Sequence, residues 1–142
     1  MTSAEVHWRF EESLLHMREL GTLRGVASGL VLLGRAAAAE GDYRGAVAAF
    51  EECIAIRHTI GEHSGMAAAL EELAQVQRRS GHLPQAVRHY AAASLLRQAT
   101  APAEAPPSVS ESVADLQSEL GADAFDRAWA EGLAHGKRLL KP

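Results

Sequence analysis

The chain repeats itself with a period of forty residues. Residues 30–61 and residues 70–101 align along their whole length without a gap. Identical residues recur forty positions apart, among them Leu30 and Leu70, Leu33 and Leu73, Gly41 and Gly81, Ala46 and Ala86, Val47 and Val87, Gly21 and Gly61, and Gly25 and Gly65. An aromatic ring recurs in the same register at Phe10, Phe50 and Tyr90. A fixed period of this length indicates stacked structural units, because a single helix pair cannot bury its own apolar face.

Composition favours a small helical protein. Of the 142 residues, 47% are apolar but only 5% are aromatic, and alanine dominates. Alanine has the highest helix propensity and β-branched residues are scarce, so we expect closely packed helices rather than sheets. A chain of this length suits one domain.

Charge and cysteine content limit the kinds of partner that the chain can bind and the cellular compartment that suits it. The net charge is −4, both signs are interleaved, and no basic tract appears, so we expect no direct binding to nucleic acid or to an anionic membrane. Cys53 is the only cysteine, which excludes an intrachain disulfide and fits a reducing cytoplasm. No signal peptide is evident, and the longest apolar stretch is too short to span a bilayer.

Glycines, prolines and capping residues divide the chain into about seven helices. The expected ranges are 4–20, 23–40, 43–60, 63–80, 83–99, 108–120 and 123–139. Pro84 falls in the first turn of its helix, where its missing N–H costs nothing. Ser108 and Glu111 have the spacing of a capping box, and Asp123 is placed to cap the last helix.

These ranges predict three regions. Residues 1–100 form helical repeats, of which the first is a half-repeat. Residues 101–107 form a proline-rich linker, and residues 108–142 form a capping helical hairpin. Within a repeat, Ala46 and Phe50 lie four apart on one helix face, as do Ala86 and Tyr90. We expect Gly34 to let the preceding helix approach closely, while the aromatic ring fills the gap beside it.

The spacing of these residues resembles the tetratricopeptide repeat. Leu30-x-x-Leu33-Gly34 followed by Ala46-x-x-x-Phe50 matches its pattern, and the next forty residues repeat the match. The chain departs from the pattern where leucine replaces the tryptophan, where Ala37 and Gln77 replace the tyrosine, and where the closing proline is absent. The resemblance covers about residues 4–100 and implies a right-handed superhelix of antiparallel helical hairpins, an all-α solenoid that binds proteins.

The longer period and the tail resemble a more specific group. Forty-residue repeats, a proline-bearing linker and the segment GADAFDRAWAEGLAH are similar to the end of the repeat domain in bacterial ATPase-type transcriptional regulators of the LuxR-like and antibiotic-regulator kinds. This resemblance implies a module that belongs to, or associates with, such a regulator.

Catalysis has little support in the sequence. The seven histidines do not form the close clusters that bind metals, no glycine-rich phosphate loop exists, and adjacent glutamates such as Glu51 and Glu52 point to different helix faces. Cys53 lies in a small-residue position with no neighbouring base, as a packed thiol would. We therefore expect a protein that is not an enzyme and binds no cofactor or metal.

A binding groove is the remaining candidate site. In the repeats that this chain resembles, the first helix of each pair lines the concave surface. The residues that this places in the groove are Ser28, Val31, Arg35, Ala38, Ala68, Glu71, Gln75 and Arg78. Of these, Arg35, Glu71, Gln75 and Arg78 are the candidate contacts, because their side chains can bond a peptide backbone or carboxylate.

Two aromatic residues near the start are candidates for an interface. Val6, Phe10, Leu14 and Met17 form an apolar stripe along the first helix, with Trp8 on a neighbouring face. We expect Trp8 and Phe10 to mediate homodimerisation, since exposed apolar surface of this size is usually buried against another chain. The leading hypothesis is a protein–protein interaction module. The alternative is a solenoid that senses a small molecule on its concave face.

Overall fold

The computed structural model describes residues 22–100 and 106–141, together with positions 2, 4, 5, 8, 11, 12 and 15. This part of the chain is helical and contains no strand, which confirms the expected all-α class. Its helices are α2 (Leu23–Ala39), α3 (Tyr43–Thr59), α4 (His63–Arg79), α5 (Leu83–Thr100), α6 (Pro107–Leu120) and α7 (Ala122–Leu140). The expected helix at 4–20 is described at six positions, and all six are helical.

Each helix from α2 to α7 agrees with its expected range to within one residue at either end. Gly41 and Gly81 have φ of 82° and 85°, a left-handed conformation that lets the chain reverse after α2 and α4. Asp42 caps the N-terminus of α3, because its Oδ1 accepts a hydrogen bond from the backbone N–H of Gly45 at 2.9 Å. The turns are short, so consecutive helices run antiparallel.

Two expected caps are wrong. The helix α6 begins at Pro107 after an extended Pro106 with ψ of 145°, and no side chain caps it, so Ser108 and Glu111 form no capping box. Pro107, placed in the expected linker, is instead the first helical residue, where proline has the right φ and needs no N–H partner. Gly121 precedes α7 without a side-chain cap, and Asp123 lies within the first turn. The rest of the expected linker, residues 101–105, lies outside the described residues.

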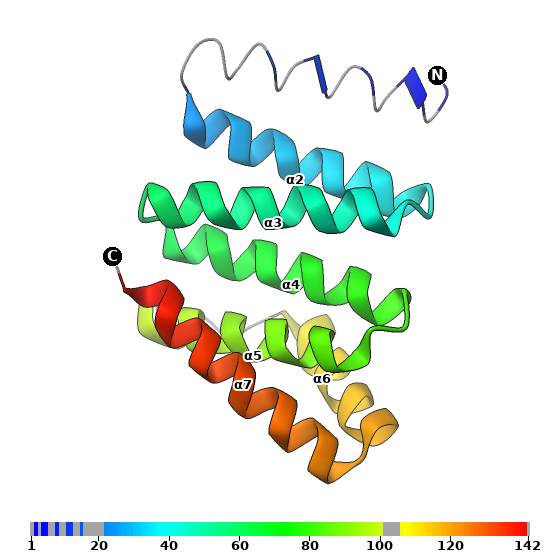
Figure 1. Ribbon diagram of the computed structural model, residues 1–142, viewed down its shortest axis with the longest axis vertical. Coiled ribbons are helices and arrows are strands. Elements are labelled where there is room, and N and C mark those ends of the chain that lie inside the picture. Colours follow the sequence, from blue (N-terminus) through cyan, green and yellow to red (C-terminus); the bar gives the residue numbers. More distant parts are fainter. Residues whose placement is uncertain are drawn as a thin grey trace.

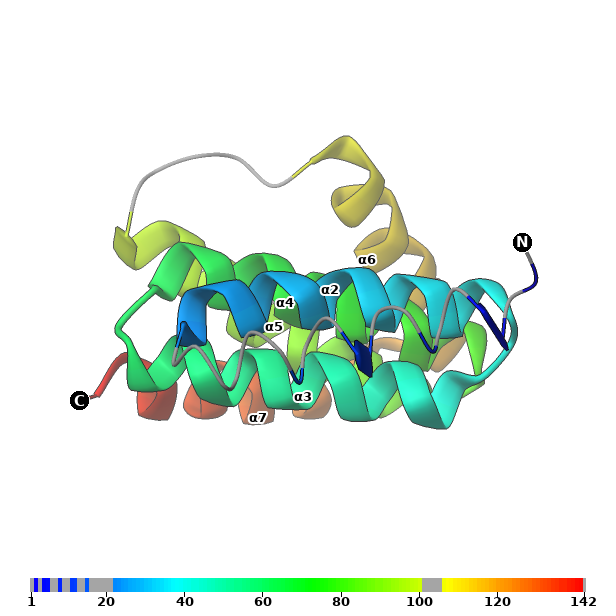
Figure 2. The ribbon, with the colours of Figure 1, turned by 90° about the horizontal axis from the view of Figure 1, so that it is seen from above.

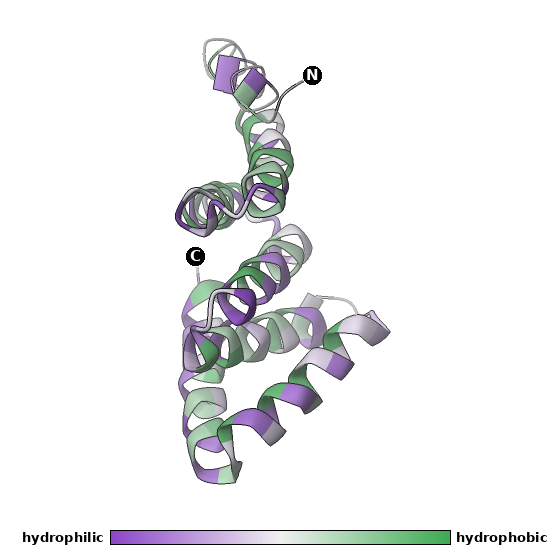
Figure 3. Cartoon of the chain, turned by 90° about the vertical axis from the view of Figure 1, so that its right-hand side faces the viewer, coloured by the Kyte–Doolittle hydropathy of each residue, from purple (hydrophilic) through white to green (hydrophobic). Residues whose placement is uncertain are grey.

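The helices α2 to α5 form an antiparallel stack in which each helix packs against the next (Figure 1). Viewed from above, α2 and α4 lie on one side of the stack, and α3 and α7 lie on the other (Figure 2). The helix α6 stands out beyond α4 on the side of α2 and α4 (Figures 2 and 3). The stack is thus a helical solenoid whose inner face carries α2 and α4, with α6 at its C-terminal end.

The repeated aromatic residues hold the stack together. Phe50 is fully buried, and a Cβ atom on Gly34 would lie 2.7 Å from its ring. Only glycine therefore lets α2 lie this close to α3. Tyr90 is 3% exposed and shares its apolar cluster with Ala74, the residue that corresponds to Gly34. The expected pairing of a small residue with a ring is thus confirmed, although Tyr90 also meets Leu116 of α6 in that cluster.

The last helix packs on α5 rather than on α6. A Cβ atom on Gly132 would lie 2.2 Å from the carbonyl oxygen of Arg88, and one on Gly136 would lie 2.9 Å from the Leu95 side chain. The two glycines therefore allow backbone-to-backbone approach between α7 and α5. Phe125 and Trp129 stack with ring centroids 5.6 Å apart and extend the apolar cluster toward α6. The glycines therefore let α7 pack directly on α5, while the two aromatic rings join α7 to α6.

Candidate functional site

Two neighbouring cavities open along the inner face of the solenoid. The first has a volume of about 540 Å³ and lies between α2 and α4, reaching Arg57 at the end of α3. The second, about 280 Å³, is bounded by α4, α5 and the start of α6. Both are lined by Arg35, Ala68 and Glu72, so they form one continuous surface, which we call the inner groove.

Ion pairs cross the inner groove. The Nε atom of Arg35 lies 2.7 Å from Oε1 of Glu72, which joins α2 to α4. Arg97 of α5 holds Glu71 of α4 with two hydrogen bonds, of which the one from Nε to Oε2 is 2.6 Å long. The Glu71 carboxylate raises the pKa of the Arg97 guanidinium, and Glu71 is only 9% exposed. These pairs link neighbouring helices across the groove, whose lining also includes apolar side chains.

The candidate residues predicted from the sequence have different surroundings. Arg35 and Gln75 are exposed and line the inner groove, as expected. Glu71 also lines it, but its carboxylate is already bound by Arg97. Arg78 lines neither cavity; it reaches α6, where its guanidinium lies 3.3 Å from Oγ of Ser112, 3.2 Å from Asp115 and 3.4 Å from Glu119. Ala38, expected in the groove, is 7% exposed and belongs to the core.

Sequence reasoning missed the contributions of α3, α5 and α6 to this groove. Arg57 and Arg97 come from the second helix of each repeat, whereas the prediction took groove residues from the first helix alone. Ser108, Val109 and Ser112 come from α6. One pattern could have revealed the two arginines, because they lie forty residues apart in the repeat register. Nothing in the sequence shows that α6 lies beside the groove, since this depends on contacts with α4 such as those of Arg78 with Ser112 and Asp115.

The two aromatic interface candidates lie in the N-terminal segment. Trp8 is described and is 61% exposed, and Leu15 is 59% exposed. Leu23 and Leu32 on α2 are also large apolar residues with exposed side chains. Phe10 lies outside the described residues. The exposed apolar side chains therefore gather at the N-terminal end of the stack.

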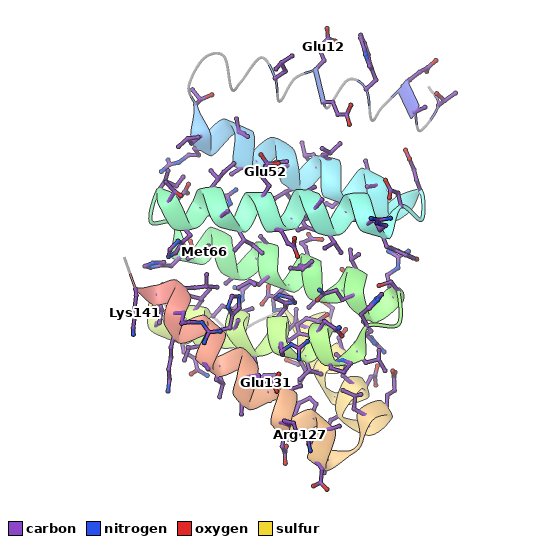
Figure 4. All side chains as sticks on the ribbon, in the orientation of Figure 1. Glu12, Glu52, Met66, Arg127, Glu131 and Lys141 are labelled. Carbon is purple, nitrogen blue, oxygen red and sulfur yellow. The ribbon has the colours of Figure 1, made fainter. Side chains whose placement is uncertain are left out.

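A cluster of histidines lies on the opposite face, between α3, α5 and α7. His89 and His135 have ring centroids 6.1 Å apart, and Nδ1 of His89 lies 2.6 Å from Oε1 of Gln77. Burial, followed by the proximity of His135, lowers the pKa of His89 to about 4. Burial also lowers the pKa of His135. Arg88 forms an ion pair of 2.8 Å with Glu131 of α7, which is labelled in Figure 4, and both residues line one cavity with His89 and His135. Within the described ranges, no group of three or more histidine, cysteine or acidic residues could hold a metal ion.

The depressed pKa of His89 predicts a loss of stability in acid. In the unfolded chain this imidazole takes up its proton near pH 6.5, but the folded protein resists protonation down to about pH 4. Neutral His89 therefore makes its full contribution to the free energy of unfolding above pH 6.5. This contribution, about 3 kcal/mol, is lost as the pH drops toward 4. Urea denaturation of the protein and of His89→Gln, at pH 7 and pH 4.5, measures the change in the free energy of unfolding between the two pH values. We expect a shallower loss in His89→Gln. The same slope in both, and in the control His63→Gln, would contradict the prediction.

Comparison with family models shows a match to the tetratricopeptide repeat over residues 25–99, which is more than half of the chain. The chain belongs to the tetratricopeptide-repeat family. A search of the curated proteins and a search of the solved structures found no match. The matched residues run from α2 to the end of α5, so the two repeats are the α2–α3 and α4–α5 hairpins. Tetratricopeptide repeats mediate binding between proteins. None of the helices that the structure describes is long and apolar enough to cross a bilayer.

Proposed function

We propose that this chain is a non-enzymatic interaction module that binds a protein partner in the inner groove. The observation that carries the proposal is the continuity of the two cavities over both tetratricopeptide repeats, with Arg35, Ala68 and Glu72 common to both. Their linings combine ion pairs with apolar side chains. Such a surface suits a peptide better than a small apolar molecule, for which a largely apolar pocket is expected.

We further propose that the module works within or beside a bacterial transcriptional regulator in the cytoplasm. Support comes from the resemblance of the tail to the closing segment of such regulators, and from α6 and α7, which follow the repeats here as well. In this view α7 covers the exposed side of α5 and acts as the C-terminal cap, while α6 borders the groove.

A photo-crosslinking amino acid at position 75 tests the groove. We expect it to trap a partner in cells of the source organism, and Arg35→Glu to lower the yield about tenfold by reversing the charge beside it. Arg44→Glu on the exposed surface of α3 makes the same charge change away from the groove and should leave the yield unchanged. Equal yields from the two variants would exclude the inner groove. A trapped partner with no part in transcription would exclude the regulator assignment but not the groove.

Self-association through the N-terminal segment is a separate proposal. Trp8 and Leu15 are more than half exposed, and an apolar surface of this kind is commonly buried between copies of a chain. Light scattering across a concentration series should show a monomer–dimer equilibrium, and Trp8→Ser should weaken it by about tenfold. A strict monomer at high concentration, with Trp8 fluorescence unchanged on dilution, would refute dimerisation.

A further inference from the structure

Each of the two repeats has an arginine at the same repeat position, but the hydrogen bonds of the two guanidinium groups differ. Arg57 lies in the last turn of α3 and Arg97 in the last turn of α5, forty residues apart, and each lines one cavity of the inner groove. In the second repeat the Nε and Nη2 atoms of Arg97 both donate to the carboxylate of Glu71, so that edge of the guanidinium is fully used. The second repeat therefore contains a built carboxylate site, occupied by a side chain of the protein itself.

The first repeat lacks the matching carboxylate. Forty residues before Glu71, the chain has Val31, which cannot accept a hydrogen bond. The Nε atom of Arg57 is buried and has no hydrogen-bond partner in the described structure. The ion pair of Arg57 runs from Nη1 to Oε1 of Glu62 at 3.4 Å, and Arg24 approaches the same oxygen at 3.3 Å. Leaving a buried donor on a charged group unpaired is costly, so this edge of Arg57 favours an acceptor from outside the chain.

Gly65 leaves the space through which the Arg57 side chain reaches the inner groove. A Cβ atom on Gly65 would lie 2.6 Å from Cδ and 2.9 Å from Nε of Arg57, so the side chain can cross α4 at this point. The guanidinium then borders the cavity of about 540 Å³, together with the apolar side chains of Val31, Leu32 and Ala69. Cys53 is fully buried, and burial raises its pKa more than its side-chain hydrogen bond with Arg57 lowers it, so the group beside Arg57 is a neutral thiol and not a thiolate.

We propose that the cavity between α2 and α4 binds a carboxylate of the partner on the Nε and Nη2 edge of Arg57, in the way that Glu71 occupies the same edge of Arg97. The carboxylate belongs to an aspartate or glutamate side chain of a peptide, and the apolar lining fits small or aliphatic residues on either side of it. This inference rests on the proposed function, because the peptide lies in the inner groove.

Supplying the missing carboxylate within the chain tests the site without any partner. Val31→Glu introduces the residue that the second repeat has at Glu71, and Val31→Gln is its uncharged control. We expect Val31→Glu to have a midpoint of thermal unfolding about 2–4 °C above that of Val31→Gln. The difference should vanish when Arg57 is replaced by methionine, as in a double-mutant cycle. Equal midpoints for Val31→Glu and Val31→Gln with Arg57 intact would overturn the proposal.

A pair of capped peptides tests binding in the full chain. The probes are acetyl-Ala-Leu-Glu-Leu-Ala-amide and the same peptide with glutamine in place of glutamate, titrated while the Nε–H resonance of Arg57 is followed by NMR. The glutamate peptide should shift this resonance and bind at least about fivefold more tightly than the glutamine peptide. Arg57→Lys keeps the charge but not the paired donors, and should remove most of the preference. Equal binding of the two peptides would overturn the proposal.

The outcomes separate this site from the groove itself. A partner whose crosslinking at position 75 depends on Arg35 but is unaffected by Val31→Glu and Arg57→Lys would leave the groove as the binding surface and overturn the carboxylate site. Coupling between Glu at position 31 and Arg57, with a glutamate preference in the peptides, would support the carboxylate site even if the crosslinked partner proved to bind elsewhere.

Discussion

Replacing Phe50 by alanine is expected to lower the free energy of unfolding by about 3–5 kcal/mol. The ring is fully buried and lies so close to Gly34 that a Cβ atom there would be 2.7 Å from it. Removing the ring leaves a cavity between α2 and α3, where it now packs against Gly34, and the surrounding helices can close that cavity only in part. Urea denaturation monitored by circular dichroism measures the change.

Two further variants complete this experiment. Tyr90→Ala should cost a similar amount, because its ring holds the corresponding position in the second repeat. Glu51→Ala changes an exposed neighbour of Phe50 on the same helix and should alter stability by less than about 0.5 kcal/mol. If Phe50→Ala and Glu51→Ala unfold at the same urea concentration, the ring is not part of the core.

Replacing Gly132 by valine is expected to cost about 3 kcal/mol, through overpacking rather than a cavity. Even the first added carbon would lie 2.2 Å from the carbonyl oxygen of Arg88, and a backbone atom cannot rotate out of the way. The helix α7 must therefore lift from α5, although valine is a better helix residue than glycine. Thermal unfolding gives the cost, and near-ultraviolet circular dichroism reports whether the stacked Phe125 and Trp129 rings lose their fixed environment.

Ala130→Val is the matched control for this variant. It places the same side chain on an exposed position of α7, two residues before Gly132, and should change stability by less than about 0.5 kcal/mol. Equal unfolding temperatures for the two variants would mean that α7 is not seated on α5 through its glycines.

The inner groove could be predicted only in part. Arg35 and Gln75 follow from the repeat pattern, because residues one turn apart on the first helix of a pair share a face. Arg78 lies farther along the same stripe, but its guanidinium bonds to Ser112, Asp115 and Glu119 of α6. Periodicity gives the face of a helix from which a side chain starts. It does not give the neighbour that a long side chain reaches, since that neighbour comes from a distant part of the chain.

The sequence by itself determined the helices and their pairing. Glycines at the turns, alanine-rich segments and the forty-residue spacing of Phe50 and Tyr90 act locally or between consecutive helices, so they can be recognised without coordinates. Tertiary structure alone decided how the helices after the repeats pack and which side chains besides predicted ones such as Arg35 and Gln75 face the groove. Two features depend on contacts between separate helices: the docking of α7 on α5, and the contrast between Arg97, whose Nε is bound by Glu71, and Arg57, whose Nε has no acceptor in the described structure. These contacts involve the close approach of two helix backbones and the burial of one nitrogen atom. Neither can be recognised from a periodic pattern in the sequence.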